Sequence, residues 1–249
     1  MKEFYVGYLP KAPAGIAKRI KTVNAIALGL GVIAAISFAR VQKTFAPSTF
    51  EYGKELSFEG VIESSPFPTL LAARSGATNT DATRYLLVAS GKRGADSQVQ
   101  PYVGKTVRLR GTLIYRGDQS MIELVKNSIS VRAASNEVPS PLSDLGTFNL
   151  TGEIVDSKCY LGVMNPGNGK VHRDCAVRCL SGGIPPIFAT DDFRGSPAIL
   201  LLTDAAGKPL PKQAFMNLVA QPVRVHGKVL QTGNTLLLEI EPGGISLLP

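Results

Sequence analysis

The longest apolar stretch of the chain lies near its N-terminus. Residues 22–39 form a run of 18 uncharged side chains that ends at Arg40. At about 1.5 Å per residue, a helix of this length extends about 27 Å, which is just enough to cross the hydrocarbon core of a bilayer. The pattern therefore predicts a transmembrane anchor over residues 22–41, preceded by an N-terminal tail over residues 1–21.

Two other interpretations of this stretch are open. Ser37-Phe38-Ala39 has the small-x-small form of a cleavage site, which would make the stretch a cleaved signal peptide. The leading segment of 21 residues is long for a signal peptide, however, and favours the anchor. A buried helix of a soluble protein is disfavoured, because no polar stripe interrupts the run.

After the anchor, apolar and polar side chains alternate with a period of two. Residues 107–111 read Val-Arg-Leu-Arg-Gly, and residues 223–227 read Val-Arg-Val-His-Gly. This alternation is typical of half-buried β-strands. Further strands are expected at residues 57–63, 85–89, 149–155 and 198–203, hairpins with turns at residues 117–118 and 233–234, and short helices within residues 96–103 and 212–219.

These elements occur twice. Residues 102–111 resemble residues 218–227 at a shift of 116 positions. The same shift aligns Gly91 with Gly207, Gly117 with Gly233, and Glu123 with Glu239. A register kept over about 40 residues, with the glycines in place, indicates two copies of one module.

Each copy reads as strand, strand, short helix and hairpin, which resembles the OB fold, a small Greek-key barrel. The predicted fold class is mainly β: an N-terminal transmembrane helix followed by two tandem OB-like small β-barrels, the second with a Cys/His-containing insertion. We expect the first barrel over residues 50–132 and the second over residues 148–249. A polar, proline-containing linker over residues 133–147 would join them.

The second copy is longer than the first after its first strand. Gly60 precedes Tyr85 by 25 residues, whereas Gly152 precedes Leu201 by 49. The extra residues define an insertion at about residues 157–190, which holds all three cysteines and one of the two histidines of the chain. In an OB barrel this loop borders the usual ligand face, so the chemistry of the protein is expected here.

One interpretation of the insertion is a metal site with four ligands, Cys159, His172, Cys175 and Cys179. If residues 171–180 are helical, the last three of these share one face of the helix. Three thiolates and one imidazole suit tetrahedral zinc, and soft sulfur ligands also select copper. The Cys-x3-Cys spacing, with Met164 nearby, is similar to that of copper-delivery and binuclear-copper proteins, although the downstream histidine of those proteins is missing.

Two other interpretations remain open. Outside the cytoplasm, Cys159 could form a disulfide with Cys175 or Cys179 and leave one free thiol. The cysteines could also be small buried core residues. A catalytic role is less expected, because no orienting group or oxyanion hole is recognisable around either helical cysteine, so no catalytic residue is predicted.

The formal net charge of +8 is distributed unevenly. Residues 1–43 carry a net charge of +6, and residues 44–249 carry only +2. The nearly neutral folded part excludes nucleic acid as an expected partner. Lys18, Arg19 and Lys21 precede the anchor, which predicts a cytoplasmic N-terminus and extracytoplasmic (periplasmic) barrels in a bacterial inner membrane.

These features together favour a non-catalytic accessory or assembly subunit of a bacterial membrane complex. A respiratory or other electron-transfer complex is the kind expected from the Cys/His insertion. Its partners would be integral-membrane subunits, in addition to lipid around the anchor, and Phe4, Tyr5 and Tyr8 in the tail suit a membrane interface or a groove on a partner. The cofactor would be zinc or copper.

The alternative function is a stand-alone periplasmic metal or cofactor chaperone. An N-terminal anchor with an OB barrel resembles the membrane-tethered haem chaperones of cytochrome c maturation. Their haem-attaching His-x-x-x-Tyr motif has no match here, because Ala176 follows His172 and Leu230 follows His226 at that spacing. A thiol oxidoreductase is a third class, and it would require an exposed, reactive cysteine.

Overall fold

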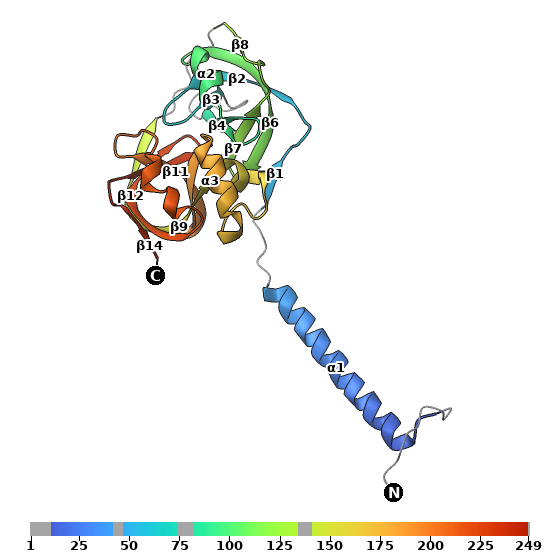
Figure 1. Cartoon of the computed structure of the whole chain (residues 1–249). Coiled ribbons are helices and arrows are strands. Elements are labelled where there is room, and N and C mark those ends of the chain that lie inside the picture. The colour runs from blue at the N-terminus through green and yellow to red at the C-terminus, as the bar shows by residue number, and fades with distance from the viewer. Residues whose placement is uncertain (1–10, 42–46, 74–81, 134–140, 249) are drawn as a thin grey trace. The chain divides into compact units, whose positions relative to one another are not determined.

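The computed structural model describes residues 11–41, 47–73, 82–133 and 141–248. The chain divides into two compact units, residues 1–45 and residues 46–249. The first contains one long helix, α1 (Ala14–Val41), and the second is built mainly from strands (Figure 1). The predicted fold class, mainly β with an apolar N-terminal helix and two small barrels, is confirmed.

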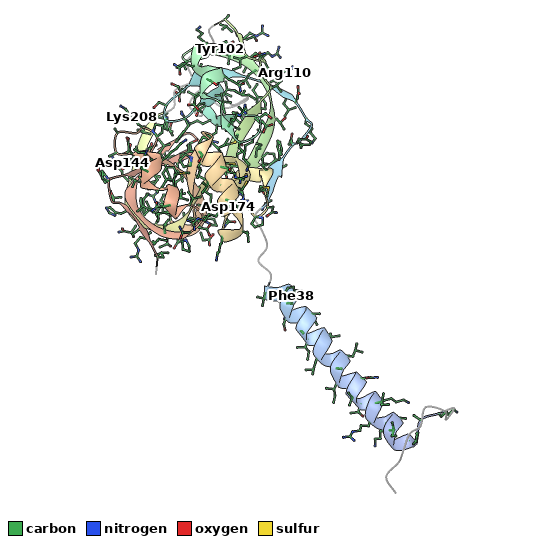
Figure 2. All side chains as sticks on the ribbon, in the orientation of Figure 1. Phe38, Tyr102, Arg110, Asp144, Asp174 and Lys208 are labelled. Atoms are coloured by element: carbon green, nitrogen blue, oxygen red, sulfur yellow. The ribbon has the colours of Figure 1, made fainter. Side chains whose placement is uncertain are left out.

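Helix α1 is long and apolar enough to cross a membrane. It begins at Ala14 rather than at residue 22, because the intervening residues are mostly good helix formers and Pro13 precedes the first turn. None of its side chains is buried. They stand out around the helix, Phe38 among them (Figure 2), and would be shielded from water by lipid. Residues 1–10 of the predicted tail lie outside the described residues.

The first barrel is a closed ring of five strands. Strand β2 (Leu56–Glu63) pairs with β3 (Thr69–Ala73), β3 with β4 (Ala82–Ala89), β4 with β7 (Gln119–Leu124), β7 with β6 (Thr106–Arg116), and β6 with β2. The β4–β7 pair is parallel and the other four are antiparallel. Outside the ring lie β1 (Ser48–Phe50), β5 (Arg93–Gly94), β8 (Ser130–Val131), α2 (Asp96–Val99) and the 3₁₀ turn η1 (Gln100–Tyr102).

The second barrel repeats this connectivity. Strand β9 (Leu142–Asp156) pairs with β10 (Pro186–Phe193), β10 with β11 (Ser196–Asp204), β11 with β13 (Thr235–Ile240), β13 with β12 (Pro222–Thr232), and β12 with β9. The β11–β13 pair is the parallel one. The 3₁₀ turns η4 (Lys212–Ala214) and η5 (Met216–Leu218) occupy the place of α2 and η1, and β14 (Ile245–Leu247) pairs with β12.

Equivalent glycines allow equivalent strand crossings in the two barrels. A methyl group on Gly60 would lie 2.1 Å from Leu71 O, and one on Gly152 would lie 2.2 Å from Ala189 O. These glycines are needed because no side chain fits where the backbones approach so closely. The repeat therefore extends from the sequence to individual contacts.

The structure differs from the predicted boundaries in two places. Strand β9 begins at Leu142, inside the predicted linker, because the long partner strand β12 pairs with it as far as Thr232 opposite Leu142. Strand β10 begins at Pro186, so the last residues of the predicted insertion belong to the barrel. Strands β3 and β10 were not predicted individually. Residues 134–140 of the predicted linker lie outside the described residues.

The two barrels share a hydrophobic core. Leu86, Val88, Ile114 and Met121 of the first barrel are buried in the cluster that contains the core of the second barrel, including Ile154 and Phe188. The interior of the first barrel forms a separate cluster around Leu87, Leu109 and Ile122. The two barrels therefore pack into one unit and are not independent domains joined by a flexible linker.

Candidate metal centre

The insertion between β9 and β10 has two arms. The first is a π-helical turn, η2 (Cys159–Val163), directly after β9, and the second is the 3₁₀ turn η3 (Lys170–His172) followed by α3 (Arg173–Ser181). A glycine turn reverses the chain between the arms. Gly167 packs against the backbone of Cys159 and Tyr160, where a methyl group would lie 2.6 Å from Tyr160 Cα. This reversal places α3 beside the start of η2.

The reversal brings together the residues that the sequence singled out. Cys159 Sγ lies 3.9 Å from Cys175 Sγ and 3.9 Å from Cys179 Sγ. The ligand atoms of Cys159, His172 and Cys175 all lie within 4.8 Å of one another. His172 is the residue before α3 and not a member of its first turn, so it occupies the N-cap position of the helix that carries the two other cysteines, although its side chain makes no capping hydrogen bond. All three cysteines are free thiols.

An aspartate that the sequence analysis did not single out completes this group. Asp156 Oδ2 lies 2.9 Å from His172 Nε2, and Asp156 Oδ1 accepts a hydrogen bond from the Cys159 backbone N–H at 2.9 Å. Its ligand atom is also within 4.8 Å of those of Cys159 and Cys179. The available signal was its place three residues before a cysteine, where a carboxylate commonly caps a turn.

A lysine of the first barrel also reaches the cluster. Lys92, on the turn between β4 and β5, places Nζ 2.7 Å from Cys175 Sγ and 3.6 Å from Cys179 Sγ. Nothing in the sequence near Lys92 pointed to this contact, because 83 residues separate it from Cys175. The candidate site therefore contains residues of both barrels.

Three of the four predicted ligands are deeply buried, and so is Asp156, at 0% exposure. Cys159 and Cys179 are 4% and 1% exposed, and His172 is 3% exposed, whereas Cys175 is half-buried. Two residues considered in the sequence analysis are exposed. Met164 is 44% exposed, and His226, on β12, is exposed with Nδ1 3.0 Å from Asn149 Oδ1. The cluster thus has one solvent-facing edge, at Cys175 and Lys92.

The thiols of the cluster do not share one protonation state. The hydrogen bond with Cys179 and burial raise the pKa of Cys159. The hydrogen bond from Cys159, together with the charge of Lys92, lowers the pKa of Cys179 to about 7. The hydrogen bond to Cys175 raises the pKa of Lys92. Near neutral pH the cluster therefore holds thiolate charge beside a cation, which is the form that binds metal ions.

The two separations of the sulfur atoms from Cys159 Sγ suit a shared metal ion. With zinc–sulfur bonds of about 2.3 Å, two thiolates of a tetrahedral site lie about 3.8 Å apart. The two distances of 3.9 Å in the cluster are close to that value. If the His172 proton is on Nε2, facing Asp156, then Nδ1 keeps a lone pair that could bind a metal ion. A metal-binding histidine usually donates its other ring N–H to a carboxylate in this way.

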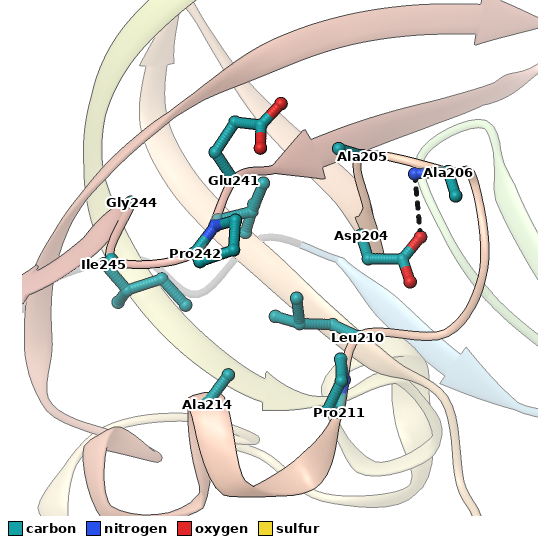
Figure 3. A pocket seen from close by; sticks show the side chains of 12 residues that line it. Asp204, Ala205, Ala206, Leu210, Pro211, Ala214, Glu241, Pro242, Gly244 and Ile245 are labelled. Carbon is teal, nitrogen blue, oxygen red and sulfur yellow. Dashed lines mark hydrogen bonds between the residues drawn. The ribbon is translucent and has the colours of Figure 1, made fainter.

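A cavity beside the second barrel lies apart from the cluster. It has a volume of about 540 Å³ and is lined mainly by apolar residues such as Leu210, Pro242 and Ile245 (Figure 3). The carboxylate of Asp204 at its edge stabilises the local turn, because Oδ1 accepts hydrogen bonds from the backbone N–H groups of Ala206 and Lys208. No cysteine or histidine lines this cavity, so it has no part in the metal centre.

Fold and site together define a mainly β protein with an apolar N-terminal helix and a Cys/His/Asp cluster that could hold a metal ion. Comparison with known proteins adds no family: no family model, no curated protein and no solved structure matches the chain.

Proposed function

We propose that this chain is a membrane-anchored, non-catalytic metal-binding subunit. Its cluster would bind one thiophilic ion, zinc or copper, through Cys159, Cys175, Cys179 and His172. The observation that carries the proposal is the position of Cys159 Sγ, 3.9 Å from each of the two other thiols. Three thiols that converge in this way, with an imidazole beside them, form a donor set for such an ion.

A metal ion explains more of the cluster than a disulfide does. A disulfide joins two sulfur atoms at about 2.05 Å and would leave the third thiol and His172 without a role. The buried His172–Asp156 pair is the arrangement that orients a metal-binding imidazole. A buried pair of this kind contributes nothing to a disulfide.

Elemental analysis with thiol counting on the detergent-purified, full-length protein tests the proposal. We expect one equivalent of zinc or copper, and its loss in the variant Cys175→Ser. A protein without metal and with a single titratable thiol would instead support a disulfide between Cys159 and one of the two cysteines on α3.

The proposal includes a location and partners. Helix α1 would cross the membrane once, with Lys18, Arg19 and Lys21 on the cytoplasmic side and the barrels on the other. The partners would be integral-membrane proteins, as in a respiratory assembly. Cross-linking in the membrane followed by purification tests this. Recovery of the chain without any cross-linked membrane protein would contradict a subunit role.

A stand-alone metal chaperone is the second candidate. It is favoured by the solvent-facing edge of the cluster, where the half-buried Cys175 could exchange its ion. Transfer of the ion to a chelator within minutes supports the chaperone, whereas retention over hours supports a structural site in a subunit. A thiol oxidoreductase would be supported by rapid labelling of one cysteine in the metal-loaded protein.

A further inference from the structure

The first barrel holds the first arm of the insertion. Lys158, the residue before Cys159, is buried with its side chain 4% exposed. Its Nζ donates hydrogen bonds to Ala89 O at 3.0 Å and Gly91 O at 2.6 Å, and it pairs with Glu123 on β7. A buried ammonium group is stable only when its donors and its charge are satisfied, so Lys158 fixes the start of η2 on the first barrel.

The next part of this arm also rests on the first barrel. The Arg116 guanidinium lies 4.1 Å from the centre of the Tyr160 ring, a cation–π contact. Gly162 packs against the backbone of Thr49, where a methyl group would lie 2.4 Å from Thr49 O. Residues on both sides of Cys159 are thus in contact with the first barrel.

The first barrel also holds the second arm, at the end of α3. The Gly94 backbone N–H donates to Gly182 O at 2.9 Å. The approach is so close that a methyl group on Gly182 would lie 1.8 Å from Lys92 O, and one on Gly94 would lie 2.4 Å from Gly183 O. The turn that carries Lys92 therefore fixes the C-terminal end of the helix that carries Cys175 and Cys179.

We propose that the metal centre belongs to both barrels, with the first barrel holding the two ligand arms in place and Lys158 acting as its main positioning residue. The inference rests on the proposed metal-binding function and gives the first barrel a role in it. A metal ion would join Cys159 on one arm to Cys175 and Cys179 on the other. Because both arms are already fixed, binding avoids most of the entropy cost of ordering them.

The inference has a reciprocal consequence. If the docked barrels favour metal binding, then metal binding must favour the docked barrels by the same free energy. The contact between Gly94 and Gly182 reports on docking, because its donor belongs to the first barrel and its acceptor to the insertion. The amide of Arg132, which bonds to Thr106 O within the first barrel, is a matched reference.

The first experiment compares metal affinity in full-length Lys158→Met and Lys212→Met. Both lysines hold the insertion, but Lys212 Nζ donates to Ser181 O from the second barrel itself. We expect Lys158→Met to weaken binding of the metal found in the wild type by about tenfold or more, as is usual when the groups that orient ligands are removed. Lys212→Met should stay within about twofold of wild type, a change of less than about 0.5 kcal/mol.

The second experiment needs no variant, so it remains decisive if Lys158→Met does not fold. Hydrogen exchange of the wild-type protein is measured by NMR with and without the metal. We expect the Gly94 amide to exchange more slowly by about tenfold or more in the metal-loaded protein, with the Arg132 amide changed much less. Equal affinities of the wild type and folded Lys158→Met, or an unchanged Gly94 amide, would overturn the inference. A wild type that binds no metal would overturn the proposed function instead.

Discussion

His172 Nε2 lies 2.9 Å from Asp156 Oδ2, and both side chains are buried, at 1% and 0% exposure. Asp156 ends β9, whereas His172 lies at the other end of the reversed loop, directly before α3. The pair therefore links the barrel to the helix that carries two of the cysteines. It also fixes the orientation of the imidazole ring beside the thiols.

This relationship gives the first prediction. Asp156→Asn removes the carboxylate that orients His172, and we expect it to weaken metal binding by about 10- to 100-fold while the barrels stay folded. Competition with a chromophoric chelator measures the affinity. Asp174→Asn is the control, because Asp174 lies on α3 with its side chain exposed. Equal affinities in the two variants would show that Asp156 does not act through His172.

The second prediction concerns the pH dependence of the thiols in the metal-free protein. The lowered pKa of Cys179, about 7, means that the first thiolate forms as the pH rises through about 7. Thiolate absorbance in the ultraviolet, followed against pH, should therefore rise there first. Lys92→Gln removes an ammonium group that lowers this pKa, so the first rise should move to higher pH. Arg93→Gln, at the next residue in the chain, should leave it in place.

The third prediction follows from the shared core. Ile114 belongs to the first barrel but is buried in the cluster of the second. We expect Ile114→Ala to lower the free energy of unfolding by about 2–5 kcal/mol. Circular dichroism during chemical denaturation should show a single shifted transition for the strands of both barrels. Two separate transitions, with only one of them shifted, would mean that the barrels unfold independently.

The fourth prediction uses the equivalent glycines. Gly60→Ala and Gly152→Ala should each destabilise the protein by about 1–3 kcal/mol, because the new methyl group meets a carbonyl oxygen of the neighbouring strand. Gly29→Ala in α1 is the control, since no atom lies within 4 Å of its added methyl group. Thermal unfolding of the three variants measures the difference. A stable Gly152→Ala protein would show that the strand crossing in the second barrel tolerates a side chain.

The site could be predicted only in part, and the reason differs from residue to residue. Cys175 and Cys179 are four positions apart on α3, and local helical geometry is enough to place them together. Asp156 and Cys159 are also close in sequence, but the role of the aspartate depends on where His172 folds back. The contacts of Lys92 and Lys158 could not be predicted from the sequence, because the partners of each lysine lie on the other barrel.

Taken by itself, the sequence determined the apolar helix, the two copies of one strand-rich module and the Cys/His insertion in the second. These features follow from short-range periodicity and from glycines that recur at a fixed shift. Both can be read from the order of residues without knowledge of the packing. Only the tertiary structure decided that the barrels share a core, that β9 extends to Leu142, and that Lys92 meets Cys175. Such contacts depend on how two closed sheets pack, because close packing joins residues that are far apart in sequence.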